Sequence, residues 1–149
     1  MVDDLASPRK RGKELSPAEY ETIAAFRHML RHFLSATDRN AEAVGLTQQQ
    51  YLAMLVLKSE PGVVTIRDLA ERMLVKHHSA VGLVDRLVRQ KLVRRARMEG
   101  DRRQVALRLT AHGTRVFLKL ANMQREELRR IGPDLGRFMA FLAGPSQAR

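Results

Sequence analysis

The fold of this chain is decided by residues 65–110, TIRDLAERMLVKHHSAVGLVDRLVRQKLVRRARMEGDRRQVALRLT. Their pattern predicts two short helices around a tight turn, followed by a basic two-stranded hairpin. The stretch holds 12 Lys and Arg against 5 Asp and Glu, a net charge of +7. A helix of this kind fits a DNA groove, and a basic hairpin beside it can neutralise phosphates. The stretch therefore indicates a winged helix-turn-helix DNA-binding unit.

The composition of the whole chain supports this interpretation. Its 149 residues suffice for one domain with a core of its own. The formal net charge of +11 is unusual for a soluble domain and favours a polyanionic partner. Nucleic acid is a better candidate for that partner than an anionic membrane surface.

Several classes of protein are disfavoured by what the sequence lacks. There is no Cys, which excludes disulfides, thiolate metal sites and cysteine redox sensing. No apolar run approaches the roughly 20 residues that span a bilayer, and the start does not read as a signal peptide. We therefore expect a cytoplasmic protein with no membrane partner. No catalytic motif or cofactor-binding loop is visible, so we expect neither an enzyme nor a cofactor.

The outer segments predict helices around this unit. Ser16 with Glu19, Thr47 with Gln50, and Thr65 with Asp68 have the spacing of helix-capping pairs. The predicted fold class is mainly α with a small β-hairpin wing. The expected elements are helices at 16–40, at 47–59 and within 65–88, strands at 92–97 and 104–109, a helix at 110–131 and a short helix at 135–142.

Two local expectations follow from the C-terminal half. In the second strand, alternation places Val105, Leu107 and Leu109 inside, and Gln104, Ala106 and Arg108 outside. Gly132 and Pro133 should end the long helix, because proline lacks the N–H that a helix interior needs.

The domain organisation follows from these elements. Residues 1–14 are expected to form a flexible basic arm that either contacts phosphates or, as we favour, is a solvated tail. Residues 15–149 form one domain, with the winged helix-turn-helix core at 46–110. The flanking helices at 16–40 and 111–143 carry apolar stripes that such a small unit cannot bury alone. We expect them to form a homodimer with two DNA-reading units.

An ordered set of short motifs resembles the MarR (multiple-antibiotic-resistance regulator) family of bacterial transcription factors. The set is Leu83-Val84-Asp85-Arg86-Leu87, Leu92-Val93-x-Arg95, Asp101-Arg102-Arg103 and Leu109-Thr110-x-x-Gly113. Two positions depart from the family pattern. Lys91 replaces a glycine before the wing, so Lys91 must adopt positive φ or the turn must differ. Gly82 replaces a large polar residue that contacts DNA in relatives.

The resemblance places candidate DNA contacts at the recognition helix and the wing. Lys76, His77, His78 and Ser79 match the end of the recognition helix that enters the major groove, although the two histidines could instead merely cap the helix. Arg103 matches the family's minor-groove arginine. Asp101 is expected to brace the tip by pairing with Arg95 or Arg103. The full set of candidate DNA-binding residues is Thr65, Lys76, His77, His78, Ser79, Arg97, Arg102 and Arg103; the arginines could also be ordinary surface residues.

His28 and His32 lie four residues apart on the first helix and should share one face. This is a metal-ligand spacing, but no third ligand is evident beyond His112 or Glu42. The nearby Arg27 and Arg31 favour an anionic ligand over a cation, so we expect no metal. The resemblance implies that a small phenolic or carboxylate effector would bind in a cleft of this protein. The candidate lining residues are Phe26, His28, Met29, His32, Tyr51, Met54 and Phe117. The alternative is that these side chains are ordinary core residues with no ligand.

These observations lead to one functional expectation and several rivals. We expect a sequence-specific, homodimeric transcriptional regulator that represses from a palindromic operator and, where it is regulated, is released by a small aromatic or anionic effector. The main alternative is a non-specific, architectural nucleic-acid-binding protein. A protein-binding winged helix and a small enzyme using His28 and His32 are weaker rivals, because neither explains the basic hairpin.

Overall fold

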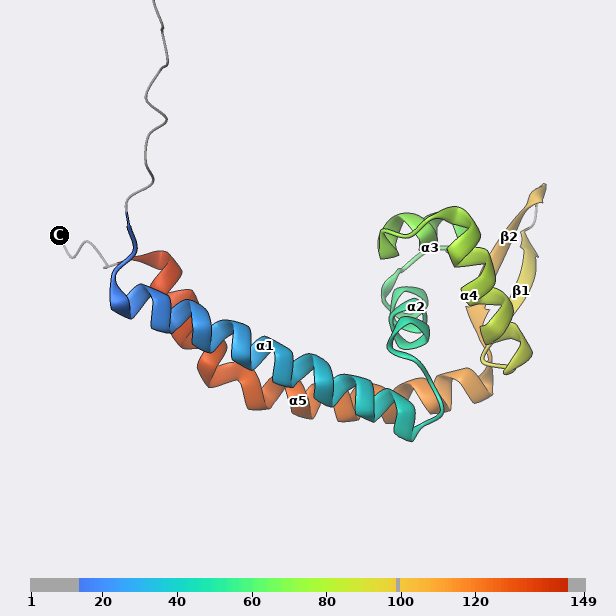
Figure 1. Ribbon diagram of the computed structural model, residues 1–149. Helices are drawn as coiled ribbons and strands as arrows, with labels where there is room; N and C mark the ends of the chain where they lie inside the picture. The colour runs from blue at the N-terminus through green and yellow to red at the C-terminus, as the bar shows by residue number, and fades with distance from the viewer. Residues whose placement is uncertain (1–13, 99, 145–149) are drawn as a thin grey trace, which may run out of the picture.

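The computed structural model describes residues 14–98 and 100–144, and only the backbone of residues 101–103. The helices and strands fall into two parts, a head and an arm (Figure 1). The head contains α2 to β2 and the start of α5, and the arm is formed by α1 and the rest of α5. The elements are α1 (Pro17–Ala43), α2 (Gln48–Ser59), α3 (Ile66–Met73), α4 (His77–Arg89), β1 (Val93–Met98), β2 (Asp101–Leu109) and α5 (Ala111–Ala143).

The predicted fold class is confirmed, and so are the predicted helix starts. Ser16, Thr47 and Thr65 each accept a hydrogen bond from the backbone N–H three residues on, and each forms a reciprocal capping box. Thr110 caps α5 in the same way through the N–H of Gly113. Each cap satisfies a backbone donor that has no acceptor within its own helix.

The core of the head is aliphatic and draws on every element around it. Met54, Leu69, Val84, Leu87 and Leu120 are completely buried, and they come from α2, α3, α4 and α5. Burial of such a side chain stabilises the fold by about 1.5–3 kcal/mol. The first turns of α5 therefore belong to the head, although the rest of this helix leads into the arm.

A backbone hydrogen bond outside the hairpin ties β2 to the rest of the head. β1 pairs antiparallel with β2, with Val93 opposite Leu109 and Arg95 opposite Leu107. The N–H of Leu107 donates to the carbonyl of Val64 at 2.8 Å, just before α3. The expectation that Ala106 points outward to solvent is wrong, since only 3% of it is exposed. Its methyl group is short, and longer side chains flank it in the strand.

The start of α5, the helix that leads from the head into the arm, depends on a close backbone approach. Lys91, which stands where the MarR family pattern has a glycine, adopts a positive φ of 58°. The hydroxyl of Thr110 donates to the carbonyl of Lys91 at 2.5 Å, and the N–H of Thr110 donates to the carbonyl of Leu92 at 3.0 Å. A Cβ at Gly113 would lie 1.9 Å from the Leu92 oxygen. Only glycine fits there, because no side chain can occupy that space.

In the arm, α1 and α5 run side by side, and both of their outer ends lie far from the head (Figure 1). The buried Gln124 of α5 donates to the carbonyl of Thr37 in α1 at 3.3 Å. Near the outer end, Phe138 stacks on Phe26 with ring centroids 3.9 Å apart.

Two expectations for these helices were wrong. α1 continues beyond residue 40 to Ala43, and α5 continues through Pro133 as one helix of 33 residues. Proline removes one hydrogen bond from the helix ladder, but packing on the far side of it, at Phe138, favours continuation.

The close approach at Gly113 gives a direct prediction about stability. Gly113→Ala should lower the free energy of unfolding by about 1–3 kcal/mol or more, because a Cβ there collides with backbone rather than with a flexible side chain. Gly136→Ala, on the same helix with nothing within 4 Å of its Cβ position, is the matched control. It should be neutral or stabilise by up to about 1 kcal/mol. Urea unfolding followed by circular dichroism measures both; equal effects would contradict the proposed collision.

Candidate nucleic-acid interface

The N-terminal end of α4 is exposed to solvent. Lys76, His77, His78 and Ser79 are all exposed, and Ala80 is the first buried residue of this helix. Among the helices of the described chain, α4 alone begins without a side-chain cap. The first N–H groups of a helix have no acceptor within it, and its N-terminus attracts negative charge. This end of α4 therefore offers donors and charge to an external anion.

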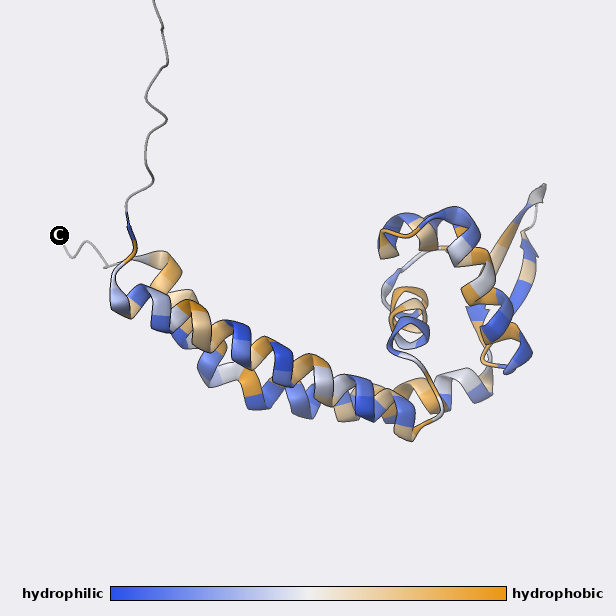
Figure 2. Ribbon diagram, viewed as in Figure 1, coloured by the Kyte–Doolittle hydropathy of each residue, from blue (hydrophilic) through white to orange (hydrophobic). Residues whose placement is uncertain are grey.

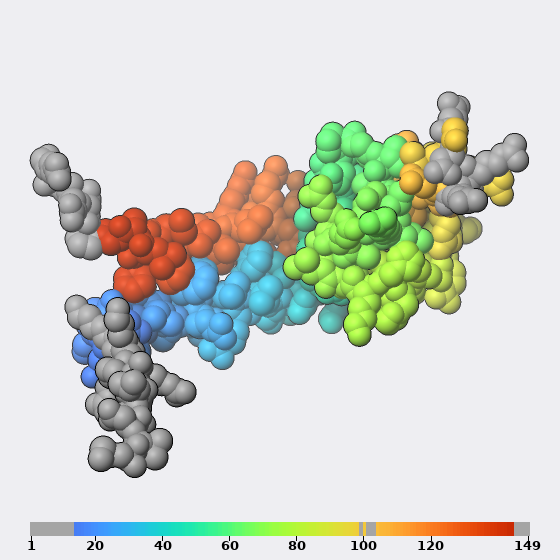
Figure 3. Space-filling view, turned by 90° about the horizontal axis from the view of Figure 1, so that it is seen from above, coloured from blue at the N-terminus to red at the C-terminus, as the bar shows by residue number. Residues whose placement is uncertain are grey.

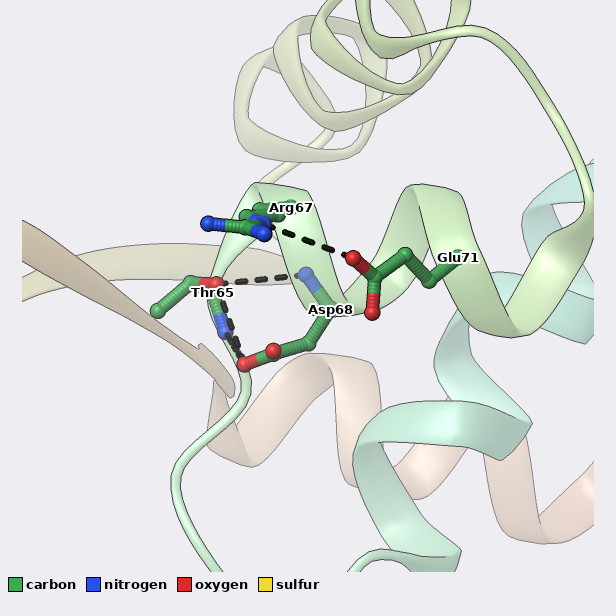
Figure 4. A network of polar contacts seen from close by, with 4 residues as sticks. All are labelled: Thr65, Arg67, Asp68 and Glu71. Atoms are coloured by element: carbon green, nitrogen blue, oxygen red, sulfur yellow. Dashed lines mark hydrogen bonds and ion pairs between the residues drawn. The ribbon is translucent and has the colours of Figure 1, made fainter.

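α3 supports α4 and is anchored at its own first turn (Figure 4). The Thr65 hydroxyl accepts from the Asp68 N–H at 3.2 Å and donates to the Asp68 carboxylate at 3.0 Å. The Thr65 N–H also donates to that carboxylate at 2.9 Å, and this bond is the main reason why the pKa of Asp68 is lowered. Thr65 therefore serves first as the cap of α3, whatever contact it makes with DNA.

The hairpin lies beside α4 and carries exposed arginines (Figure 1). Arg94 of β1 stands directly opposite Arg108 of β2, and both side chains are exposed, as is that of Arg97. Like charges directly opposite each other destabilise a strand pair, so an anion bound between them would relieve this repulsion. Of the other candidates, Arg102 and Arg103 lie in β2, and their side chains are outside the described residues.

Arg95 has a partner in α4 that the sequence pattern did not indicate. Its guanidinium forms an ion pair and a hydrogen bond with the Asp85 carboxylate of α4. In the backbone register of the hairpin, Asp101 lies opposite Met98 near the tip, three residues from Arg95 along β1. That is about 10 Å along a strand. The Arg95–Asp85 pair thus braces the base of the wing against the recognition helix, a role the sequence pattern did not assign to Asp85. The Asp101 side chain is outside the described residues.

The residues predicted to line one effector cleft fall into two groups. Tyr51, Met54 and Phe117 are buried in the core of the head, where Tyr51 stacks on Phe117 with ring centroids 5.7 Å apart. Burial raises the pKa of Tyr51. Because these three side chains pack against one another and their neighbours, their position agrees with the plain-core alternative.

Phe26, His28, Met29 and His32 instead line a cavity of about 510 Å³ between α1 and α5. This cavity lies in the arm, and α5 contributes residues to it that the sequence pattern did not single out: Ile131, Asp134, Arg137 and Phe138. Arg137 and Asp134 form an ion pair at its edge. The volume lies within the range of small-molecule sites, and most of the lining is apolar.

The His28 and His32 rings meet edge to face, with centroids 4.4 Å apart. Within residues 14–98 and 100–144, no three His, Asp or Glu side chains are grouped so that they could hold a metal ion. His112 and Glu42 do not join the pair in such a group. The histidines therefore present two imidazoles to the cavity in the arm.

Comparisons with known proteins agree with this geometry. The MarR family model matches residues 44–104, which run from just before α2 into β2 and include α4. Residues 44–104, most of the head, are thus similar in sequence to the MarR family. None of the helices in the described part of the chain is long and apolar enough to cross a membrane.

Two sequence relatives of the chain are transcriptional regulators by name. The chain is 32% identical over 79 residues to the uncharacterised HTH-type transcriptional regulator YfiV of Bacillus subtilis. The matched segment covers 53% of this chain and 49% of YfiV. The chain is 30% identical to the HTH-type transcriptional regulator FarR of Neisseria gonorrhoeae, covering 62% of each chain. It thus spans about half the length of YfiV.

Among solved structures, AbsC, a MarR family transcriptional regulator from Streptomyces coelicolor, superimposes with a TM-score of 0.68 at 25% identity. That match covers 83% of this chain and 84% of AbsC. Since it extends well beyond residues 44–104, the likeness includes helices of the arm as well as the head.

Proposed function

We propose that this protein is a transcriptional regulator that binds double-stranded DNA through α4 and the wing. The observation that carries the proposal is the exposed, uncapped N-terminus of α4, with Lys76, His77, His78 and Ser79, beside a hairpin of exposed arginines. The described relatives are named as transcriptional regulators, which supports the same function.

The proposed contacts divide by chemistry. His77, His78 and Ser79 donate to or accept from base edges in the major groove. Lys76, Arg94, Arg97 and Arg108 contact phosphates, which positions the protein without reading sequence. Arg103 enters the adjacent minor groove, where a narrow groove concentrates negative potential, and Arg102 and Thr65 contact the backbone.

We further propose that two chains form a dimer through their arms. α1 and α5 cover only one side of each other, and apolar residues recur along both (Figure 2). On α5, an exposed apolar stripe at helical spacing consists of Leu128, Leu135, Met139 and Leu142; on α1, Tyr20, Ile23 and Leu34 are also exposed. A two-fold dimer would present two copies of α4 to a palindromic operator, which suits a repressor.

The cavity in the arm supports a regulatory role. We propose that a small aromatic anion binds there against Phe26 and Met29, with its charge toward His28, His32 and Arg137. Such a ligand releases DNA only to the extent that it binds one arrangement of the two heads more tightly than the other.

One prediction from the proposed function separates base contacts from phosphate contacts. The double variant His78→Ala/Ser79→Ala should lose about 10-fold or more in affinity for the selected operator and much less for random DNA, because base contacts specify sequence. Arg97→Ala should weaken both by a similar factor and reduce the dependence of affinity on salt. Fluorescence anisotropy with both duplexes at several salt concentrations measures this. If the parent shows no preference for any sequence, the architectural alternative is correct.

The second prediction concerns assembly. Met139→Glu should convert the dimer to monomers at micromolar concentration, because it places a charge in the exposed apolar stripe. Lys119→Glu changes charge on the other side of α5 and should leave the dimer intact. Sedimentation velocity distinguishes the two masses. A parent protein that sediments as a folded monomer would refute the dimer.

The third prediction concerns the cavity. Salicylate should raise the melting temperature of the parent and lower its operator affinity, since binding to the native state stabilises it. His28→Ala/His32→Ala should abolish both effects, whereas His112→Ala, outside the cavity, should not. Zinc chloride is titrated in parallel. A response to zinc but not to salicylate, lost in the double variant, would show that the two histidines bind metal instead.

A further inference from the structure

Leu74, in the turn between α3 and α4, has an unusual environment for a leucine. It is 93% exposed, the highest value among the large apolar side chains of the described residues, where the next is Leu142 at 61%. Its backbone is also left-handed, with φ 55° and ψ 41°. An L-residue with a branched side chain is disfavoured in this region, and glycine or asparagine is the ordinary choice.

No contact among the described residues of the head accounts for a leucine at this position. The left-handed turn is closed by backbone bonds, from the N–H of Leu74 to the carbonyl of Glu71 at 3.3 Å and from the N–H of Val75 to that of Ala70 at 3.1 Å. Any residue could make these bonds. The side chain adds almost no packing because it is nearly fully exposed. Leu74 therefore has a conformational cost and an exposed apolar surface, and no contact with the described residues compensates for them.

The position of Leu74 suggests an external contact. It lies two residues before Lys76, and the four residues from Lys76 to Ser79 are exposed as well. Leu74 thus extends the proposed DNA-reading surface with one purely apolar side chain. Seen from above, α3 and α4 form the surface of the head next to the wing (Figure 3).

We infer that Leu74 is a specificity-determining residue that contacts the C5-methyl group of a thymine in the major groove. This inference rests on the proposed DNA-binding function. Leucine can neither donate nor accept a hydrogen bond, and the thymine methyl is the apolar feature that base edges present in that groove. The contact would favour thymine at one position of each half-site, at the edge of the bases that α4 reads.

The test uses the full-length protein and a duplex that the parent itself selects from a randomised DNA pool. Each thymine is replaced in turn by deoxyuridine, which lacks only the methyl group. The parent should lose roughly fourfold in affinity at one position per half-site, the value expected for one buried methyl group. Leu74→Gly should bind the thymine duplex more weakly and show no loss at that position. Leu74→Met, which keeps an apolar side chain, should retain the loss.

Lys91→Gly is the matched control, because Lys91 has the same left-handed backbone at the other end of α4. Both glycine variants should melt at the same or a higher temperature than the parent. Lys91→Gly should keep the deoxyuridine loss that Leu74→Gly lacks. A common change in both would show an effect of backbone relaxation and overturn the inference.

The remaining outcomes are also decisive. If Leu74→Gly shows the same deoxyuridine losses as the parent, or if the parent shows none, Leu74 does not read thymine and the inference fails while DNA binding stands. Equal weakening of Leu74→Gly on all duplexes, independent of thymine, indicates a sugar contact and also overturns it. If the parent selects no sequence at all, the proposed function itself fails.

Discussion

The carbonyl group of Leu92 fixes the start of α5, the helix that leads from the head into the arm. It accepts the N–H of Thr110 at 3.0 Å and lies against the Cα of Gly113, in space that no side chain could share. The Thr110 hydroxyl fixes the preceding carbonyl, that of Lys91, at 2.5 Å. The end of α4, the start of β1 and the start of α5 are thus fixed by contacts among four neighbouring residues. The direction of the arm and the position of the recognition helix depend on these same contacts.

This rigidity bears on how a signal from the arm would reach the DNA. Ion pairing between Arg95 and Asp85 ties the base of the wing to α4, and the bond from Leu107 to Val64 ties β2 to the segment before α3. The reading elements are therefore connected to one another and to the first turns of α5. Under the proposed function, a ligand in the cavity between α1 and α5 would act by changing how the two arms of a dimer pack, and would move each head as a unit. Rearrangement within a head would have to break several of these contacts.

Much of the fold could be predicted because its signals are local. The capping pairs at Ser16, Thr47 and Thr65 follow from neighbouring residues, and all are present. The positive φ of Lys91, one of two outcomes that the family resemblance left open, is also present. The errors arose where distant packing decides. Pro133 lies inside α5, where Phe138 packs on Phe26 more than a hundred residues away in sequence. Distant packing also sets two features that the sequence pattern did not indicate. The Arg95–Asp85 pair depends on how the wing packs against α4, and the division of the expected effector-pocket residues between head and arm depends on which faces of α1, α2 and α5 meet. Periodicity alone carries no information on these tertiary contacts.

Leu74 and Lys91, two non-glycine residues with left-handed backbones, lie before and after α4. The fold explains one of them and does not explain the other. Lys91 is explained by the fold, because its carbonyl is held by Thr110 and its turn leads directly into the buried Leu92. Glycine would make the same turn, and a lysine adds only an exposed charge. Leu74 closes an equivalent turn at the other end, but its side chain is apolar, almost wholly exposed and adjacent to the residues proposed to read DNA. A strained conformation that the fold does not require persists more readily where the side chain has a function, and the neighbouring surface indicates what that function is.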